Sequence, residues 1–398
     1  GNTGLKKDND TLSHNSPPLI TISNLSEEEI YGAMRRFKLN CVSGFDQIPS
    51  FIVKDCAIAL VKPLCFMFNL ALNSETFPNS WKDARVCPIF KNGDVSNIKN
   101  YRPISLSSNL SKVFESVIRN RVFPKIKKLI TTSQHGFMTN RSTISNLVCI
   151  SQFLSESLDR RRQVDVIYTD FSKAFDCVQH DILLSKMSSL GFSETLLNFF
   201  KSNLDHRTNY VSLGGYLSDK YIANTGVPQG SILGPLLFNI YINDVVDLFV
   251  NSQCLLYADD LKIFRIVSSR EDCLQLQSDI NQIFKWSENN NLKLNLAKCK
   301  VISFTRNENK IIFDYSVNTV QLHRCSTFKD LGVIFDQKLS FIDHLCYITN
   351  AALRTLGFIV RNSRDFHSVP VLKILYFSLV RSKLEYANII WSPYYIYQ

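Results

Sequence analysis

The sequence predicts an α+β fold, because β-hairpins and helices are mixed along its middle instead of alternating as regular strand–helix–strand units. Three segments indicate this. Residues 164–170 form a strand-like run of alternating Val, Ile and Tyr, residues 254–266 form two apolar runs joined by a short turn, and residues 271–286 have helical periodicity. We find no internal repeat and no low-complexity segment.

The first part of the chain predicts a linker followed by helices and one strand. Residues 1–22 are polar and rich in Ser, Asn and Pro, which is typical of a linker. Ser26 followed by Glu29 is a capping-box pattern that opens a helix with its apolar positions on one face. We then expect a break at residues 43–49 and a second helix at residues 51–72. A strand follows at residues 86–90, a turn at residues 91–94 and a third helix at residues 111–122.

The rest of the chain predicts short strands and further helices. Asp181 is expected to cap a helix that Gly191 ends. The pair Gly214-Gly215, which lies between the strand-like residues 208–213 and 220–223, predicts a hairpin. Short strands are expected at residues 300–304, 311–315 and 331–335, and the pattern becomes helical from Ser340 nearly to the end.

Composition and charge limit the classes of function. The 398 residues include 45 Lys or Arg and 35 Asp or Glu, which gives a formal net charge of +10. A basic surface of this size favours a polyanionic partner, either nucleic acid or an acidic membrane. The 11 cysteines form no Cys-x-x-Cys pair, which argues against a zinc ribbon and favours reduced thiols in a cytosolic or nuclear protein. No apolar run approaches the roughly 20 residues that span a bilayer.

Carboxylates are placed at the ends of apolar strands. Asp259 and Asp260 adjoin between two such runs, and Asp170 ends a third. A solvated Asp-Asp turn and an Asp that caps a strand end are the alternative interpretations. Three carboxylates on adjacent strands would bind two Mg²⁺ ions well, because hard cations take oxygen ligands. Two such ions activate an attacking hydroxyl and stabilise the leaving oxygen.

A series of short motifs points to a family. In chain order they are Asn100-Tyr101-Arg102-Pro103-Ile104-Ser105-Leu106, Gln134-His135-Gly136-Phe137, Asp170-Phe171-Ser172-Lys173-Ala174-Phe175-Asp176, Gly226-Val227-Pro228-Gln229-Gly230-Ser231, Tyr257-Ala258-Asp259-Asp260, Leu294-Asn295-Leu296-Ala297-Lys298 and Leu331-Gly332-Val333. With these motifs the chain resembles the reverse transcriptases of non-LTR retrotransposons, close to the jockey-like group of animal LINE elements. Each motif alone is weak, but their order over most of residues 40–340 makes the match specific.

The resemblance implies a metal site. It makes Asp170 and Asp259 the ligands, with Asp260 beside them as a third carboxylate. The backbone carbonyl of Phe171 would complete one coordination shell. The expected cofactor is a pair of Mg²⁺ ions, for which Mn²⁺ can substitute.

The resemblance also implies a site for the incoming nucleotide. Phe175 would lie against the sugar and exclude a ribose 2′-hydroxyl, with packing in the core as the alternative. Gln229 and Gly230 belong to a glycine-bounded loop that is expected to open a helix, whose first amides favour phosphate. Gln229 would touch the nucleotide or the template base. A plain turn before a buried helix is the alternative.

Four basic residues are candidates for contacts with substrate. Arg102 matches a family motif and Lys91 follows a predicted strand, and both are candidates for the triphosphate because a guanidinium fork or an ammonium suits phosphate oxygens. Lys298 is a candidate to give a proton to the leaving pyrophosphate. Arg141 is a candidate for template contact. For Lys91, Lys298 and Arg141, a solvated surface charge is the alternative.

The architecture implied is that of a right-hand polymerase. Fingers with an N-terminal extension are expected over residues 23–163, a catalytic palm over residues 164–339 and a helical thumb over residues 340–398, where relatives continue further. Because the chain opens with Gly1, we expect a fragment, and whether an endonuclease precedes it is left open.

The function implied is RNA-directed DNA polymerisation by a mobile element, with an RNA template, a DNA primer and deoxynucleoside triphosphates as partners. A catalytically inactive nucleic-acid-binding remnant is the alternative. A cellular enzyme related to telomerase or intron maturases fits the motifs less well. We expect no membrane partner and a location in nucleus and cytoplasm as a ribonucleoprotein with the element RNA. The RNA copied, the insertion site and the oligomeric state are left open.

Overall fold

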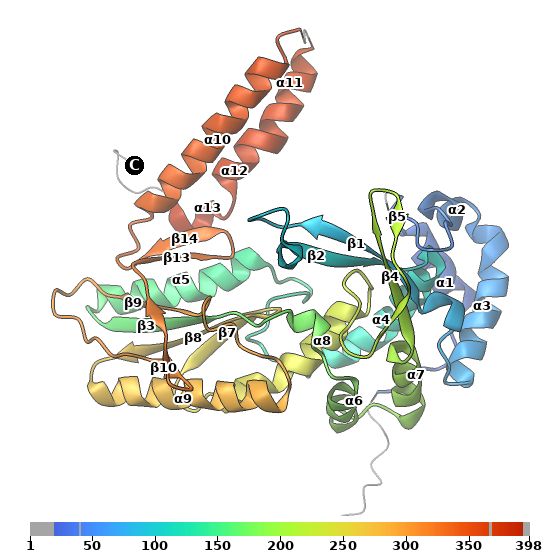
Figure 1. The fold of residues 1–398 in the computed structure, drawn as a ribbon, viewed down its shortest axis with the longest axis horizontal. Coiled ribbons are helices and arrows are strands. Elements are labelled where there is room, and N and C mark those ends of the chain that lie inside the picture. The colour runs from blue at the N-terminus through green and yellow to red at the C-terminus, as the bar shows by residue number, and fades with distance from the viewer. Residues whose placement is uncertain (1–19, 40, 366–367, 393–398) are drawn as a thin grey trace, which may run out of the picture.

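The computed structural model describes residues 20–39, 41–365 and 368–392 (Figure 1). Most of the expected linker, residues 1–19, therefore lies outside the described residues. Ile20, at its end, is fully buried, and its backbone N–H donates to the carbonyl of Gly191 at 3.0 Å. The linker predicted over residues 1–22 is therefore wrong at its end, because Ile20 is part of the packed core.

The N-terminal helices pack around a cluster of aromatic rings. They are α1 (Glu27–Arg35), α2 (Ser50–Asp55), α3 (Ala57–Asn73) and α4 (Asn109–Ile126), joined later in the chain by α6 (His180–Ser189) and α7 (Glu194–Leu204). The rings of Phe68 and Phe114 stack 4.4 Å apart at the centre. Both hydrogen bonds of the capping box between Ser26 and Glu29 are present, as predicted. The second predicted helix is two helices, which are separated at Cys56.

A five-stranded sheet lies beside these helices. Its strands are β1 (Asp83–Phe90), β2 (Tyr101–Leu106), β4 (Arg207–Leu213), β5 (Tyr216–Leu217) and β6 (Tyr221–Ala223). The order is β2-β1-β4-β5, and β6 also pairs with β4. The hairpin predicted at Gly214 and Gly215 is confirmed, and both glycines have the positive φ that such a turn requires.

A second five-stranded sheet, the central sheet, is covered by a helix on each face (Figure 1). Its order is β12-β9-β3-β8-β7, built from β3 (Gln163–Thr169), β7 (Gln253–Tyr257), β8 (Asp260–Val267), β9 (Lys300–Phe304) and β12 (His323–Arg324). Helix α5 (Thr143–Asp159) covers one face and α9 (Arg270–Asn289) the other. Strand β3 alternates accordingly: Val164 and Val166 pack in the core on the α5 side, whereas Ile167 packs in the core that includes α9. The buried strand predicted over residues 164–170 is thus confirmed.

Three predictions of local structure are wrong. No strand forms over residues 311–315, because the side-chain amide of Gln163 takes up both backbone groups of Ile311, at 2.8 and 2.9 Å. The strand predicted at residues 331–335 begins only at Val333, since Leu331 and Gly332 have positive φ and form the turn between β13 (Thr327–Asp330) and β14 (Val333–Asp336). Helix α6 begins at His180, so Asp181 lies in its first turn and does not cap it.

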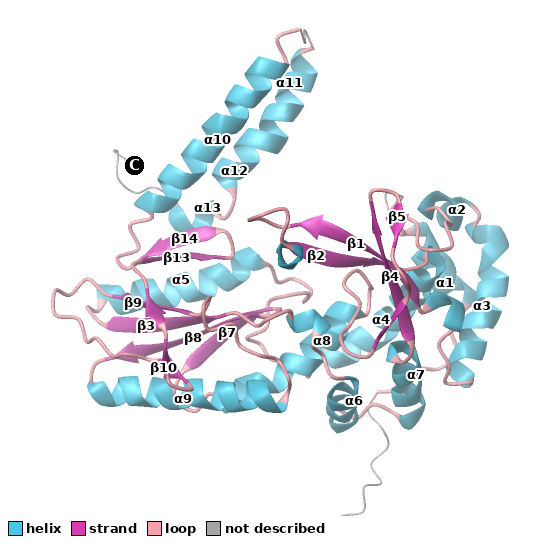
Figure 2. Cartoon of the chain, in the orientation of Figure 1, coloured by secondary structure: helices cyan, strands magenta, loops and turns pink. Residues whose placement is uncertain are grey.

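The C-terminal segment forms a helical arm that projects from the central sheet (Figures 1 and 2). It contains α10 (Ile342–Asn362), α11 (Val369–Leu375), a π-helical segment (Tyr376–Arg381), α12 (Ser382–Glu385) and α13 (Asn388–Trp391). At its base, Ile390 and Trp391 join the core formed by α5 and β14. No helix in the described parts of the chain is long and apolar enough to cross a membrane.

Candidate active site

The register of the central sheet brings the predicted carboxylates together. Strand β3 pairs antiparallel with β8 so that Thr169 lies opposite Leu261. Asp170, which follows β3, therefore lies beside the turn between β7 and β8, in which Ala258 and Asp259 separate the paired residues Tyr257 and Asp260. Segments almost 90 residues apart in sequence thus meet at one end of the sheet.

The charges around Asp259 show that the two carboxylates act on each other. Burial and the nearby Asp170 carboxylate raise the pKa of Asp259, and the positive charges of Lys91 and Arg102 counteract this rise. A shared cation at this position would relieve the repulsion between Asp170 and Asp259. The donor set also suits Mg²⁺, which prefers carboxylate oxygens and keeps water and phosphate in its remaining positions.

Asp260 has a different environment. It lies two residues before Lys262 on β8, and alternate residues of a strand share a face. On that face Lys262 forms a buried salt bridge with Asp330. Burial, followed by repulsion from Asp259, Asp330 and Asp170, raises the pKa of Asp260 to about 6. A metal role for Asp260 stays a prediction, and no cluster of three or more His, Cys, Asp or Glu side chains able to hold a metal occurs within residues 20–39, 41–365 and 368–392.

The segment that carries Lys298 is held against Asp170. The backbone N–H of Asn295 donates to the carbonyl of Asp170 at 2.7 Å, and Phe171 forms a β-bridge with Leu294. The ammonium of Lys298 lies 3.2 Å from a carboxylate oxygen of Asp170. The predicted proximity of Lys298 to the carboxylates is therefore present. The metal contact predicted for the carbonyl of Phe171 stays a prediction.

Lys91 and Arg102 come from the β1–β2 hairpin of the other five-stranded sheet. Lys91 directly follows β1, and Arg102 lies in β2 opposite Ile89. Both side chains are exposed, and neither forms a hydrogen bond or ion pair with another described residue. Both lower the pKa of Asp259, so their positive charges act at the carboxylate end of the central sheet.

The turn that carries Asp259 is held in an unusual conformation by Gln134. Ala258 has a φ of 57°, which is costly for a residue with a side chain. The buried amide of Gln134 donates to the Ala258 carbonyl at 3.2 Å and accepts from the Ala258 N–H at 2.9 Å. Gly136 permits this approach, because a Cβ there would lie 2.3 Å from the Ala258 nitrogen. The motif Gln134-His135-Gly136-Phe137 does not by itself indicate this role for Gln134.

Phe175 and the Gln229 loop lie on the side of α8 (Gly234–Ile242). The half-buried ring of Phe175 stacks on Phe238 with centroids 4.2 Å apart, and Phe137 meets its edge. Gly230 has a φ of 125°, and a Cβ there would lie 2.6 Å from the Ser105 carbonyl oxygen. The backbone of Gln229 is tied to β2 as well, since its carbonyl accepts from the Ser105 N–H at 2.7 Å.

Two amides between Gln229 and the following helix are bound inside the protein, and phosphate contact by the amides that open this helix stays a prediction. Helix α8 begins four residues beyond Gly230. The N–H groups of Ile232 and Leu233 before it donate to the carboxylate of Glu115, at 2.7 and 3.3 Å. Glu115 is 1% exposed, so these amides are turned into the protein and away from a ligand.

Arg141 has a structural role in the described residues. Its guanidinium donates to the carbonyls of Thr132 and Gln134, and thereby holds the segment that supports Ala258. Contact of Arg141 with a template stays a prediction.

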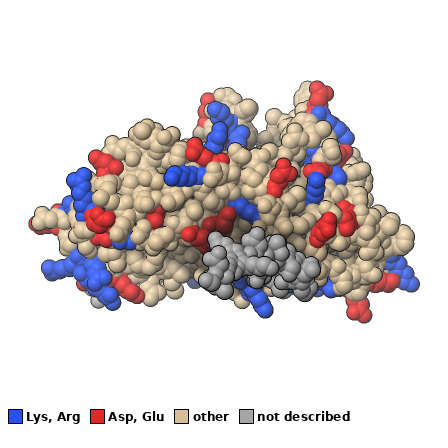
Figure 3. Space-filling model, turned by 90° about the horizontal axis from the view of Figure 1, so that it is seen from below, with Lys and Arg blue, Asp and Glu red and all other residues tan. Residues whose placement is uncertain are grey.

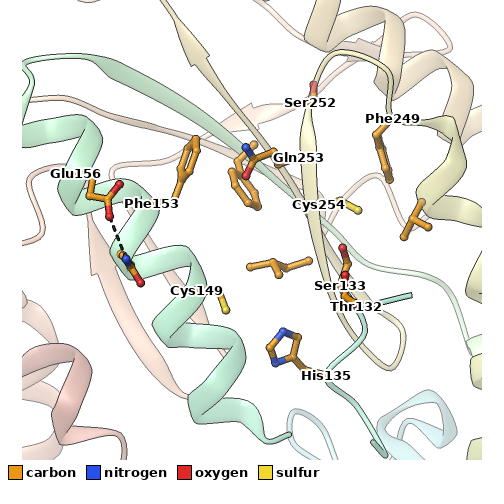
Figure 4. Close-up of a pocket in the computed structure, with 14 residues that line it drawn as sticks. Thr132, Ser133, His135, Cys149, Phe153, Glu156, Phe249, Ser252, Gln253 and Cys254 are labelled. Carbon is orange, nitrogen blue, oxygen red and sulfur yellow. Dashed lines mark hydrogen bonds between the residues drawn. The ribbon is translucent and has the colours of Figure 1, made fainter. Parts of the chain in front are cut away.

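A cavity of about 560 Å³ is lined by residues other than Asp170, Asp259 and Asp260 (Figure 4). It is bordered by α5, β7 and the 3₁₀ segment Asn243–Leu248, and His135, Cys149 and Cys254 are among its lining residues. None of the predicted site residues lines it. The carboxylate end of the sheet, and not this cavity, is therefore the candidate active site.

Comparison with known proteins identifies the family. Residues 89–358 match the family described as reverse transcriptase (RNA-dependent DNA polymerase). The chain belongs to the reverse transcriptase family. The matched range includes every predicted site residue, from Lys91 to Lys298, and the α+β class is the one expected for this family.

Relatives among mobile elements confirm the resemblance found in the motifs. The chain is 29% identical to the RNA-directed DNA polymerase from mobile element jockey of Drosophila melanogaster, over 83% of this chain and 37% of that protein. It is 29% identical to the probable RNA-directed DNA polymerase from transposon BS of the same species, over 87% of this chain and 40% of that protein. It is 26% identical to the probable RNA-directed DNA polymerase from transposon X-element, and the match covers 92% of this chain and 41% of that protein. The chain thus spans well under half the length of these relatives.

Proposed function

We propose that this chain is the catalytic core of an RNA-directed DNA polymerase of a mobile element, which transfers deoxynucleotides to the 3′-hydroxyl of a DNA primer on an RNA template. The observation that carries the proposal is the meeting of Asp170 and Asp259 at one end of the central sheet, with the exposed cations of Lys91 and Arg102 beside them. Opposite charges are thus placed where a nucleoside triphosphate and its cations would be bound.

The predicted site residues have different roles in this reaction. Two Mg²⁺ ions, or Mn²⁺ in their place, would be held by Asp170 and Asp259, and would supply activation of the primer hydroxyl and stabilisation of the leaving oxygen. Lys91 and Arg102 bind the triphosphate oxygens and hold them in line. Lys298, whose ammonium contacts Asp170, is placed to hold a proton near the leaving pyrophosphate.

Selection of the sugar is assigned to Phe175. Its ring is fixed by Phe238 and Phe137, so it cannot easily turn aside. A fixed ring beneath the sugar excludes a 2′-hydroxyl by overlap. We therefore expect deoxynucleotides to be preferred.

We infer that the subregions follow the right-hand arrangement. The β1–β2 hairpin and the helices around it serve as fingers, the central sheet as the palm and the helical arm as the thumb. Support comes from the position of Lys91 and Arg102 near Asp259 and from the way the arm projects beyond the sheet (Figure 1). Activity in nucleus and cytoplasm, together with the element RNA, belongs to the same proposal.

Primer extension by the purified chain tests the function. A labelled DNA primer is annealed to RNA and, separately, to a DNA template of the same sequence, with and without Mg²⁺. We expect deoxynucleotide addition on RNA that stops when the metal is chelated and returns when it is restored. Primer–template binding without any extension in Mg²⁺ or Mn²⁺ would instead identify an inactive nucleic-acid-binding remnant.

A further inference from the structure

The side chain of Gln229 is held by Asp176. The Nε2 group of Gln229 donates to Oδ1 of Asp176 at 2.8 Å. The two residues come from different motifs, because Asp176 closes the short 3₁₀ turn Ala174–Asp176 after the catalytic strand. The hydrogen bond therefore links the loop that carries Gln229 to the segment that carries Asp170 and Phe175.

The main chain at Asp176 is held by contacts with the segment that precedes Gln229. Its carbonyl accepts from the hydroxyl of Thr225 at 3.0 Å, and the carbonyl of Phe175 accepts from the Val227 N–H at 2.8 Å. Gly226 makes this close approach feasible, because a Cβ there would lie 2.8 Å from the Asp176 carbonyl oxygen. The carboxylate of Asp176 is therefore presented from a fixed main chain.

The rest of the Gln229 loop is also fixed. The Gln229 carbonyl is bound by the Ser105 N–H, and the amides of Ile232 and Leu233 are bound by Glu115. Rotation of the Gln229 side chain is the freedom that these contacts leave, and Asp176 removes it.

The chemistry of the pair sets which end of the amide is free. An ionised carboxylate only accepts hydrogen bonds, so it selects the NH₂ end of Gln229. The Oε1 atom is then the end left for a ligand, and no donor to it is found among the described residues. We propose that Asp176 is a positioning residue that makes Gln229 present a hydrogen-bond acceptor to a donor group on the incoming nucleotide or its paired template base.

The experiment is a double-mutant cycle in steady-state primer extension, and the inference rests on the polymerase function proposed above. The variants are Asp176→Ala, Asp176→Asn, Gln229→Ala and both double mutants. Asp176→Ala should raise KM for the deoxynucleotide on the order of tenfold with a smaller change in kcat, because the amide is no longer oriented. Asp176→Asn retains an acceptor and should fall between wild type and Asp176→Ala.

The inference is tested by whether the effects of the Asp176 and Gln229 substitutions on KM depend on each other. If Asp176 acts through Gln229, neither substitution at residue 176 changes KM further once Gln229 is Ala. The matched control is Glu156→Ala, which removes the carboxylate that accepts from Gln152 Nε2 at 3.0 Å beside the cavity (Figure 4). That control should leave KM and kcat as in wild type.

The outcomes separate the two proposals. Additive effects of the substitutions, or an unchanged KM in an active Asp176→Ala enzyme, would reject the positioning role and leave the polymerase function standing. Wild-type chain that binds but does not extend a primer would reject the polymerase function itself. If thermal melting shows that Asp176→Ala does not fold, the cycle with Asp176→Asn is used instead. The positioning role then requires that Asp176→Asn raises KM in the wild type and not in Gln229→Ala.

Discussion

At the scale of single residues, the charge on Asp259 is expected to be required for the reaction and not for the fold. Asp259→Asn should lower the extension rate on the order of a thousandfold, because a neutral amide is a poor ligand for a hard cation. Folding should be unchanged or slightly more favourable, since burial and Asp170 already oppose the charge of Asp259. Single-turnover extension and thermal melting measure the two effects.

The control for this substitution is Asp219→Asn, which changes an exposed aspartate outside the site and should leave both quantities unchanged. Extension by Asp259→Asn at a rate near that of wild type would show that the metal site has been misassigned.

A second residue-scale prediction concerns Phe175. Phe175→Val or Phe175→Ala should raise incorporation of ribonucleotides relative to deoxynucleotides, because the ring no longer occupies the space of a 2′-hydroxyl. Both changes also remove the stack on Phe238 and should destabilise the fold by about 1 to 3 kcal/mol. The measurement is the ratio of kcat/KM for the two nucleotide types.

Phe153→Ala serves as the control, since Phe153 also contacts another ring, the edge-to-face neighbour Phe264, and lines the cavity that holds none of the predicted site residues. It should lose stability without a change in nucleotide preference. An active Phe175 variant with unchanged preference would leave the ring with a packing role alone.

The site could be predicted from sequence where residue type alone implies chemistry. Carboxylates at the ends of apolar strands made Asp170 and Asp259 candidates, and the family motifs indicated metal ligation for both, together with roles for Lys298 and Arg102. Gln134, Asp176 and Glu115 were missed as contributors. Their roles depend on hydrogen bonds to residues 124, 53 and 117 positions away, and no local pattern encodes such separations.

At the scale of elements, the hydrogen bonds between Gln134 and the β7–β8 turn are expected to stabilise the fold and to increase the rate of extension. Gln134→Ala leaves the buried N–H groups of Ala258 and Gly136 without their acceptor. The cost should be about 1 to 3 kcal/mol of unfolding free energy. The extension rate should fall as well, because Asp259 follows the turn that is loosened.

Urea denaturation and single-turnover extension test this prediction. Gln152→Ala, which removes an exposed amide from α5, should change stability by no more than about 0.5 kcal/mol. A Gln134→Ala protein as stable and as fast as wild type would contradict a supporting role for the amide.

Elements were predictable where apolar periodicity and turn residues agreed, as in β3, the β4–β5 hairpin and α9. The residues at 311–315 show why this fails elsewhere. They have strand-like composition, yet Gln163 binds the backbone of Ile311 and Arg324 donates to the carbonyl of Phe313. Side chains from distant segments thus replaced the neighbouring strand that the local pattern implied.

At the scale of the whole molecule, the excess of positive charge predicts salt-dependent binding of primer–template. On the face shown in Figure 3, basic and acidic side chains are interspersed, with a group of basic side chains at its left end. The exposed cations of Lys91 and Arg102, which lower the pKa of Asp259, come instead from the β1–β2 hairpin. The exposed Arg354 and Arg361 lie on α10 of the helical arm.

We expect log affinity to fall with log salt with a slope on the order of −4 or steeper. Arg354→Ala with Arg361→Ala should make the slope shallower by about 1.5, at roughly 0.7 to 0.9 per phosphate contact. These substitutions are preferable to removal of the arm, because Trp391 at its base belongs to the core. Affinity nearly independent of salt, or a slope that the double substitution leaves unchanged, would mean that the charge is merely solubilising.

In the part of the chain that the structure describes, the helical arm is attached to the rest of the protein at its base (Figure 1). Helix α10 has 21 residues and is therefore about 31 Å long. It begins after Phe341, a residue with a φ of 55°, and is held near that end by the core around Ile390 and Trp391. A rotation of about 10° at the base moves the far end by about 5 Å, more than the roughly 3.4 Å between successive nucleotides of one strand. The packing at the base, to which Ile390 and Trp391 contribute, would therefore set the position of the far end of the arm to within the spacing of single nucleotides.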